Sequence, residues 1–225
     1  MLNDFISLFF PNNCSCCNQV LKKGENYVCV ICQTELPRTN YINQKDNPVS
    51  KLFWGRVELI YGFSTFHFGK HGRLQDLIHD LKYKNATGIG LFLGQQVGQE
   101  IKDSLPPNTF SYVIPVPLHP KKKLQRGYNQ STFLAEGISE VCGVPMNEKI
   151  IIRQVETTSQ TRKSKFERWE NVEDIFKIID ARHENKHFLL VDDVVTTGST
   201  LESCALELLK IPGSKVSIAV AASGL

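Results

Sequence analysis

The sequence lacks any long apolar run and any strong excess of one charge. No stretch approaches the roughly 18 apolar residues that a membrane-spanning helix needs, so we expect no membrane insertion. The 225 residues include 26 Lys and Arg against 23 Asp and Glu, a net charge of +3. A chain so nearly balanced is not marked as a nucleic-acid binder over its whole surface, so any basic function must be local. Neither an internal repeat nor a low-complexity tract is present, and the 41% of hydrophobic residues is typical of a globular protein.

Residues 1–11 are apolar but do not have the features of a secretory signal peptide. They contain Asp4, and neither a basic start nor a small-residue cleavage site is present. We interpret them as an amphipathic docking segment. Seven cysteines are an odd number, and five of them fall between Cys14 and Cys32. This clustering favours metal binding over a disulfide framework and predicts a cytoplasmic protein.

Two Cys-x-x-Cys pairs predict a structural metal site in residues 1–36. Cys14 and Cys17 form the first pair, and Cys29 and Cys32 form the second, eleven residues further on. Four thiolates at this spacing can surround one tetrahedral Zn²⁺ ion. A module of this size has a small core, so the metal would supply much of its folding free energy. Cys16 could replace Cys14 or Cys17, and redox dithiols or an iron–sulfur cluster remain alternatives.

The rest of the chain reads as an α/β domain at 57–225, preceded by a polar linker at 37–56. Apolar and β-branched runs predict one or two strands within 57–68 and further strands at 112–116, 188–191 and 215–222. Periodic apolar residues predict helices at 74–83, 89–103, 131–142 and 201–209. Gly90, Gly94 and Gly98 would stack on one helix face and permit close backbone packing. Alternating strands and helices imply a parallel sheet with right-handed crossovers.

The segment from Leu189 to Thr200 carries the most chemical information. An apolar strand is followed by Asp192 and Asp193, and then by a loop of small hydroxyl residues and one glycine that opens a helix. Ligands of open α/β sheets bind at the carboxyl ends of strands. The free N–H groups of a helix start suit a phosphate, and the carboxylates can accept hydrogen bonds from a sugar diol. Together they predict a site for a phosphorylated ribose, against the simpler alternative of a capped helix beside two solvated aspartates.

This motif resembles that of the type I phosphoribosyltransferases. The resemblance implies that Asp192 and Asp193 hold the ribose hydroxyls of phosphoribosyl pyrophosphate, bound with Mg²⁺, and act as the catalytic pair. It also implies that the loop after them holds the 5-phosphate. The ligand-binding residues of this motif would be Val194, Thr196, Thr197, Gly198, Ser199 and Thr200.

Two basic segments could handle the pyrophosphate. Lys121, Lys122, Lys123 and Arg126 fall within six residues of a loop that continues to Asn129 and Gln130. Cations at this place would stabilise the charge that develops on a pyrophosphate leaving group, and Asn129 and Gln130 would add neutral donors. The alternative is a solvated basic loop. We include Lys121, Arg126, Asn129 and Gln130 among the ligand-binding residues.

A second basic run, at 153–171, mixes cations with aromatic residues. It contains Gln160, Arg162, Lys163, Lys165, Phe166, Arg168 and Trp169. A mobile hood that excludes water from the active site is one interpretation, with Arg168 touching the ligand. Binding of single-stranded nucleic acid is the other.

The order of these motifs along the chain resembles the ComF family, which is linked to natural competence and DNA uptake in bacteria. The resemblance rests on the Cys pairs, the Leu-Ile-x-x-Leu-Lys helix at 77–82, Pro-Val-Pro-Leu-His-Pro at 115–120, Arg-Gly-Tyr-Asn-Gln at 126–130 and the acidic motif. Gln160, Arg168 and Asn171 also match it. It implies a phosphoribosyl pyrophosphate site and a role in DNA uptake, while the acceptor of any transfer is not indicated by a motif. A phosphoribosyltransferase of nucleotide salvage and a non-catalytic factor that binds single-stranded DNA stay open, and Lys82 could face either the site or solvent.

Overall fold

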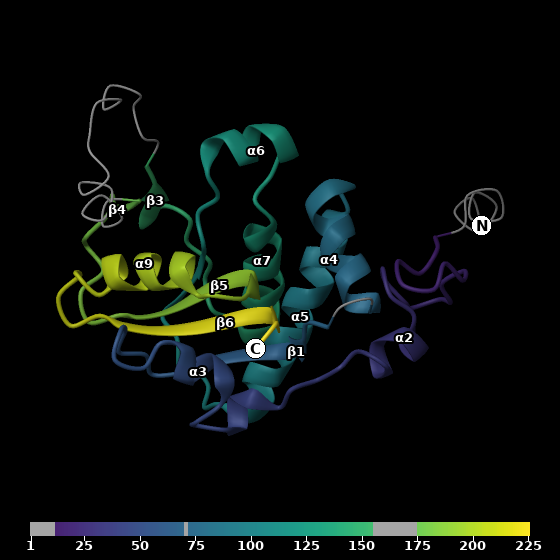
Figure 1. Cartoon of the computed structure of the whole chain (residues 1–225), viewed down its shortest axis with the longest axis horizontal. Coiled ribbons are helices and arrows are strands. Elements are labelled where there is room, and N and C mark those ends of the chain that lie inside the picture. Colours follow the sequence, from purple (N-terminus) through teal and green to yellow (C-terminus); the bar gives the residue numbers. More distant parts are fainter. Residues whose placement is uncertain (1–11, 70–71, 155–174) are drawn as a thin grey trace.

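A four-stranded parallel sheet forms the centre of the computed structural model, which describes residues 12–69, 72–154 and 175–225 (Figure 1). The strand order is β1-β6-β5-β2. The strands are β1 (Gly62–His67), β2 (Tyr112–Pro115), β5 (His187–Val195) and β6 (Lys215–Ser223). β5 and β6 are the inner strands, and from Phe188 to Val191 no side chain of β5 is exposed. Such continuous burial explains why their sequences read as unbroken apolar runs.

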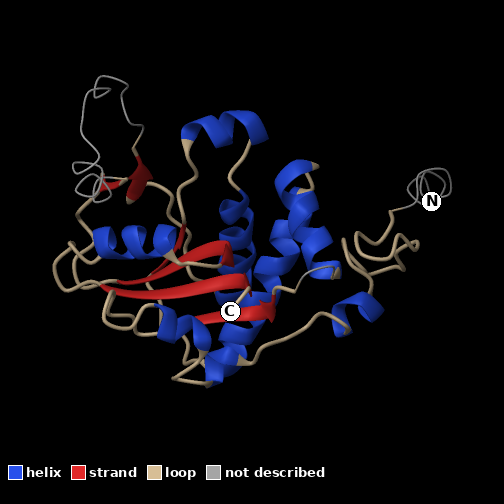
Figure 2. Cartoon of the chain, viewed as in Figure 1, coloured by secondary structure: helices blue, strands red, loops and turns tan. Residues whose placement is uncertain are grey.

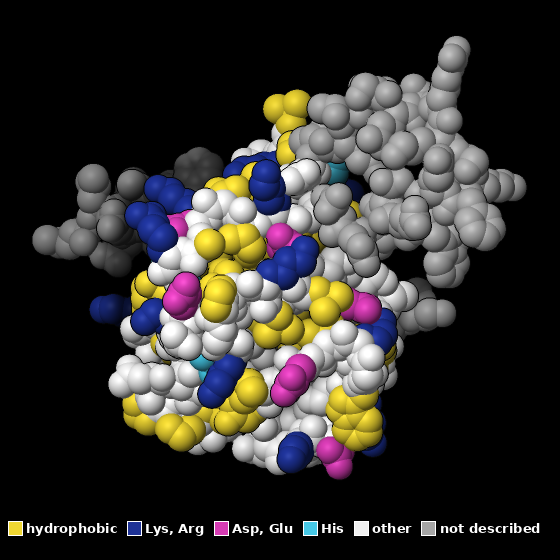
Figure 3. Space-filling view, turned by 90° about the vertical axis from the view of Figure 1, so that its left-hand side faces the viewer, with side chains coloured by type: hydrophobic (Ala, Val, Ile, Leu, Met, Phe, Trp, Pro, Cys, Tyr) yellow, Lys and Arg dark blue, Asp and Glu magenta, His cyan; other side chains and the backbone are white. Residues whose placement is uncertain are grey.

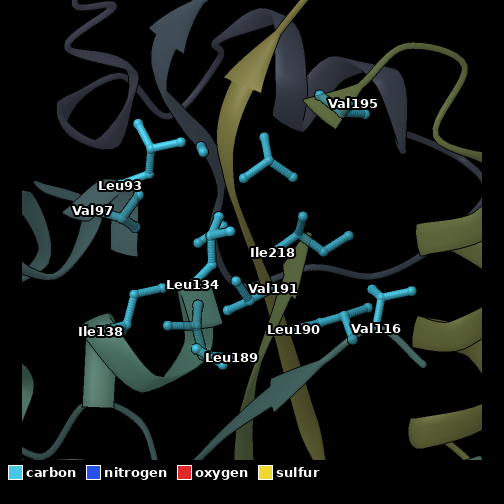
Figure 4. Packing of buried hydrophobic residues seen from close by; sticks show 14 of the residues in the cluster. Leu93, Val97, Val116, Leu134, Ile138, Leu189, Leu190, Val191, Val195 and Ile218 are labelled. Carbon is cyan, nitrogen blue, oxygen red and sulfur yellow. The ribbon is translucent and has the colours of Figure 1, made fainter. Parts of the chain in front are cut away.

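Helices cover both faces of this sheet (Figure 2). α4 (Arg73–Tyr83), α5 (Thr87–Ser104) and α7 (Gln130–Cys142) gather on one side, and α9 (Ser199–Leu208) lies on the other. Leu93 and Leu134, from α5 and α7, pack against the sheet residues Leu189 and Val191 in the core (Figure 4). The α/β fold with a parallel sheet flanked by helices is therefore confirmed. No helix in the described ranges is long and apolar enough to cross a membrane.

α5 and α7 approach each other closely through glycine, as predicted for the first helix. A Cβ atom on Gly94 would lie 2.2 Å from the carbonyl oxygen of Leu134. Reciprocally, a Cβ atom on Gly137 of α7 would lie 2.4 Å from the carbonyl oxygen of Leu91. The backbones are in direct contact at this crossing, so a side chain at either position would force the helices apart.

Residues 37–56, for which the polar composition predicts a linker, are folded against β1. They contain a 3-10 turn η1 (Tyr41–Asn43) and helix α3 (Pro48–Leu52). The buried Asn47 caps α3 by accepting a hydrogen bond from the backbone N–H of Ser50, at 3.0 Å, and its amide donates to the Gly62 carbonyl oxygen at 2.7 Å. Phe53 is fully buried. A polar residue here satisfies backbone groups, which composition alone does not reveal.

Two short strands flank the second basic run. β3 (Ile151–Arg153) pairs antiparallel with β4 (Phe176–Ile178). One further short helix, α2 (Val30–Thr34), lies in the cysteine module, directly after Cys29. Residues 155–174, with Arg168 and the predicted hood, lie outside the described residues, as does the predicted docking segment at 1–11. On the face drawn in Figure 3, acidic and basic side chains are interspersed, in keeping with the balanced composition.

The substitution Gly94→Ala tests the helix crossing. Alanine is favoured over glycine by about 1 kcal/mol in a helix interior. The clash with Leu134 should nevertheless lower the free energy of unfolding by about 1–3 kcal/mol, measured by urea denaturation. Gly72→Ala is the matched control, because a Cβ atom at Gly72 meets nothing within 4 Å. A Gly94→Ala protein more stable than the wild type would contradict the close packing.

Candidate functional site

Two adjacent carboxylates stand at the carboxyl end of the buried strand β5. Asp193 is only 4% exposed. Asp192 Oδ1 accepts a hydrogen bond from the hydroxyl of Ser131, at 2.8 Å, and another from the backbone N–H of Asp193, at 2.9 Å. Ser131 belongs to the first turn of α7, so the helix start fixes the orientation of the carboxylate.

Removal from water raises the free-energy cost of two negative charges at this position. Loss of water and then the neighbouring negative charge of Asp193 raise the pKa of Asp192 well above its usual range. The ammonium of Lys82 lies 2.9 Å from Oδ2 of Asp193 and offsets part of this charge. Oδ2 makes no regular hydrogen bond within the described part of the chain, so the ion pair with Lys82 is its strong polar contact there.

A phosphate-binding geometry follows directly after the carboxylates. The chain turns at Gly198, whose φ of 75° is the left-handed conformation that glycine adopts without strain, and α9 begins at Ser199. A Cβ atom on Gly198 would lie 2.9 Å from Leu52 and 3.0 Å from the ring of Phe53, so the turn rests on the folded 37–56 segment. Thr196, Thr197, Ser199 and Thr200 are exposed. The first N–H groups of α9 have no partner within the helix, and with these hydroxyls they form a potential anion site.

The carboxylates, the start of α9 and the basic loop enclose one cavity of about 150 Å³. Its walls include four cationic side chains, from Lys82, Lys122, Arg126 and Arg153. The remaining lining residues are Val116, Leu118, Gln130, Ser131, Asp192, Asp193 and Thr200. A cavity with cations around a carboxylate pair suits a ligand that carries both hydroxyls and several phosphates.

The structure brings only some of the predicted residues to this cavity. Asp192, Asp193, Thr200, Arg126 and Gln130 line it. The other predicted residues of the described chain do not: Lys121, Asn129, Val194, Thr196, Thr197, Gly198 and Ser199.

Asn129 already has structural partners for both ends of its amide. Its Nδ2 donates to the carbonyl oxygen of Val116 at 3.0 Å, and its Oδ1 accepts from the N–H of Ser131 at 3.3 Å. Asn129 therefore caps α7 and ties it to the end of β2.

The basic segment predicted as a loop contains a helix. α6 (Pro120–Arg126) has proline at its first position, and His119 Nδ1 accepts a hydrogen bond from the N–H of Lys121 at 3.1 Å. Gly127 ends it in the left-handed conformation. Proline at the first turn and glycine just past the end are the usual helix limits, and this pattern was available in the sequence.

Six cavity residues are absent from the predicted set: Lys82, Val116, Leu118, Lys122, Ser131 and Arg153. Lys82 follows Leu81, the last residue of the buried face of α4, and so lies at the border of that face. This border position indicates that Lys82 could face the site, but it does not determine the direction of the side chain. Arg153 begins the second basic run, and its guanidinium lies 5.5 Å from the ring of Phe176 on the paired strand.

The N-terminal cysteines form a compact cluster that could hold a metal ion. The sulfur atoms of Cys14, Cys17, Cys29 and Cys32 all lie within 4.8 Å of one another. Burial alone would raise the pKa of Cys14, but backbone N–H groups, from Cys29 first and then from Cys17 and Cys16, lower it to about 6. A thiol held as thiolate in this way is a ready metal ligand.

The cysteine cluster is joined to the domain by α4 and α5. Arg73, the first residue of α4, forms an ion pair with Glu35, and its interaction with the Cys32 thiol raises the pKa of the Arg73 guanidinium. Tyr27 packs over Gly88 so closely that a Cβ atom there would lie 1.9 Å from its ring. The cluster is therefore anchored to α4 and α5, and α4 carries the cavity residue Lys82.

Comparisons with known proteins bear on the origin of this arrangement. No family model matches the chain. Competence protein F of Haemophilus influenzae is 24% identical over 227 residues, covering 93% of this chain and 96% of its own. The DNA utilization protein YhgH of Escherichia coli K12 is 25% identical over 232 residues, with 94% and 96% covered. Competence protein ComFC of Bacillus subtilis is 24% identical over 197 residues, with 88% and 78% covered. Over most of its length the chain is therefore similar to proteins named for competence and for DNA utilization, as the resemblance to the ComF family led us to expect.

Solved structures similar to the chain include two phosphoribosyltransferases. The glutamine phosphoribosylpyrophosphate amidotransferase of B. subtilis gives a TM-score of 0.43 at 19% identity, covering 59% of this chain and 26% of that one. The adenine phosphoribosyltransferase of Saccharomyces cerevisiae gives a TM-score of 0.39 at 9% identity, covering 75% and 83%.

Proposed function

We propose that this ComF-family protein binds phosphoribosyl pyrophosphate with Mg²⁺ and serves DNA uptake as a phosphoribosyltransferase. The observation that carries the proposal is the cavity in which Asp192 and Asp193, the start of α9 and four cations face one another. The names of its relatives, which refer to competence and to DNA utilization, support the biological setting.

Each part of the ligand has a counterpart in the site. The ribose hydroxyls would donate to Asp192 and Asp193, and the 5-phosphate would sit on the loop from Thr196 to Thr200, among its hydroxyls and helix N–H groups. Arg126 would receive the pyrophosphate, since a guanidinium binds phosphate oxygens in pairs. The exposed Lys121 is placed to attract the polyanion before it enters.

The carboxylates also fit a magnesium-loaded ligand. Mg²⁺ prefers oxygen ligands and binds few carboxylates together with substrate phosphates, and it would neutralise charge on the pyrophosphate. In a transfer reaction, the bond between ribose C1 and the pyrophosphate oxygen breaks, and the pyrophosphate leaves with the electron pair while an acceptor lone pair forms the new bond to C1. Asp192 and Asp193 would hold the ribose and stabilise the positive charge that builds up on it.

Replacing both carboxylates tests the site. Asp192→Asn/Asp193→Asn should weaken binding of phosphoribosyl pyrophosphate by at least about 100-fold, because two hydrogen bonds to charged acceptors are lost. Calorimetric titration in the presence of Mg²⁺ measures this change. The control is Asp76→Asn/Asp103→Asn, which alters two exposed aspartates outside the cavity by the same charge. Equal affinity in the acidic-pair variant and the control would refute the assignment.

A second candidate function is binding of single-stranded DNA without catalysis. It is favoured by the exposed surface beside the cavity, where Lys121 and Lys123 precede Leu124, which is 88% exposed. Tyr83 is 66% exposed, and the guanidinium of Arg126 lies 5.4 Å from its ring. Cations with exposed aromatic groups are what single-stranded DNA binds through phosphates and stacked bases.

Salt dependence of oligothymidine binding tests this candidate. If α6 contacts the phosphates, Lys121→Gln/Lys123→Gln should reduce the slope of log affinity against log salt by about 1.4, measured by fluorescence anisotropy. Lys22→Gln/Lys23→Gln, in the cysteine module, removes two equally exposed charges and should leave the slope unchanged. Absence of salt-dependent binding by the wild type would remove the candidate.

We propose Zn²⁺ as the ion of the cysteine cluster, because four thiolates form the closed tetrahedral set of structural zinc. A cluster of unpaired thiols also supports a cytoplasmic location, where thiols stay reduced.

Zinc content separates the ligands from the surplus thiol. Cys29→Ser should lose the one equivalent of zinc expected for the wild type, and the module should become sensitive to protease, because metal binding supplies its folding free energy. Cys16→Ser, which removes the cysteine outside the cluster, should keep the metal. Elemental analysis of the purified proteins measures the outcome, and zinc loss from the Cys16 variant alone would reverse the ligand assignment.

A further inference from the structure

Lys82 occupies a defined place between the acidic and the basic parts of the cavity. It lies in the last turn of α4, directly after the fully buried Leu81, and its ammonium lies 2.9 Å from Oδ2 of Asp193. Its side chain lines the cavity together with Arg126 and Lys122.

The turn that carries Lys82 is held on both sides by the basic segment. The hydroxyl of Tyr128 donates to the carbonyl oxygen of Leu81, immediately before Lys82. The guanidinium of Arg126 lies over the ring of Tyr83, immediately after it. The backbone of Lys82 is thereby kept beside the groups that would receive the pyrophosphate, and the four-carbon side chain has the rotatable bonds that a change of partner requires.

The present partner of Lys82 is a group that the ligand itself would need. Asp193 is almost fully buried, and its Oδ2 makes no regular hydrogen bond within the described part of the chain. A ribose hydroxyl that donates to Asp193 would compete with the ammonium for the carboxylate. At the same time the pyrophosphate would bring several negative charges into the same cavity, where a single lysine is attracted more strongly to them than to one carboxylate.

We propose that Lys82 is a positioning residue that exchanges partners: it pairs with Asp193 in the free protein and with the pyrophosphate in the complex. This inference rests on the proposed function and adds to it a selectivity for the pyrophosphorylated sugar over its monophosphate. In the free protein Lys82 pairs with Asp193 and offsets part of the negative charge of the acidic pair. When the ligand binds, a ribose hydroxyl takes the place of the Lys82 ammonium at Asp193, and the ammonium pairs with the pyrophosphate.

The test compares two ligands that differ only in the pyrophosphate. Phosphoribosyl pyrophosphate and ribose 5-phosphate are each titrated by calorimetry, with Mg²⁺, into the wild type and Lys82→Met. Lys82→Met should weaken binding of phosphoribosyl pyrophosphate about 10- to 100-fold, the value of one charge-assisted hydrogen bond. Ribose 5-phosphate should bind the variant as tightly as the wild type or more tightly, because its ribose no longer displaces an ammonium.

Lys84→Met is the matched control. Lys84 lies two residues away, pairs with Asp80 at 2.9 Å and does not line the cavity, so the affinities for both ligands should stay at wild-type values. If Lys82→Met does not fold, Lys82→Gln carries the same comparison, since its amide can still donate to Asp193 but lacks the charge. The same ligand-selective loss is expected.

The outcomes distinguish failure of the partner exchange from failure of the proposed phosphoribosyl pyrophosphate binding on which it rests. Equal weakening of both ligands would overturn the exchange and leave Lys82 a purely structural counter-ion, and unchanged affinity for both would overturn it as well. A wild type that binds neither ligand would refute the phosphoribosyl pyrophosphate site itself, and the exchange with it.

Discussion

The packing of two neighbouring carboxylates, the half-buried Asp192 and the buried Asp193, at the end of β5 is the constraint on which the site depends. Isolated buried charges of this kind cost several kcal/mol each, so they persist only with partners. The partners come from three elements: α7 supplies the hydroxyl of Ser131, α4 supplies the ammonium of Lys82, and the backbone of β5 itself donates to Asp192. The first turn of α7 and the last turn of α4 are thus both held in contact with the two carboxylates of β5.

α4 connects this requirement to the cysteine cluster. Its first residue, Arg73, forms an ion pair with Glu35, three residues after Cys32, and Lys82, nine residues later, contacts Asp193. At about 1.5 Å per residue these two contacts are separated by roughly 14 Å along one rigid helix. The cysteine module therefore has a structural consequence beyond its own fold, because it fixes the start of the helix that delivers the counter-ion.

Sequence reasoning succeeded where one physical requirement dominates a stretch of chain. The strands and long helices follow from apolar periodicity, and the turn at Gly198 needs a residue free to adopt positive φ. Polar residues that serve the backbone are harder to interpret from sequence: Asn47, in the predicted linker, satisfies a buried carbonyl group, and Asn129, a predicted ligand residue, also caps α7. The direction of Lys82 depends on packing between elements that are distant in sequence, which no local pattern encodes.

The cavity wall suits the proposed phosphoribosyl donor better than it suits an acceptor of the phosphoribosyl group. Four cations and a carboxylate pair provide for phosphates and ribose, but among the described lining residues only Val116 and Leu118 are apolar, and none is aromatic. A heterocyclic acceptor would need an aromatic or extended apolar surface for stacking. The ring of Tyr83 lies beyond the lining, 5.4 Å from the guanidinium of Arg126. The described cavity thus suits the charged sugar phosphate that we propose as its ligand, and under that proposal selection of the acceptor would rest on groups outside this wall.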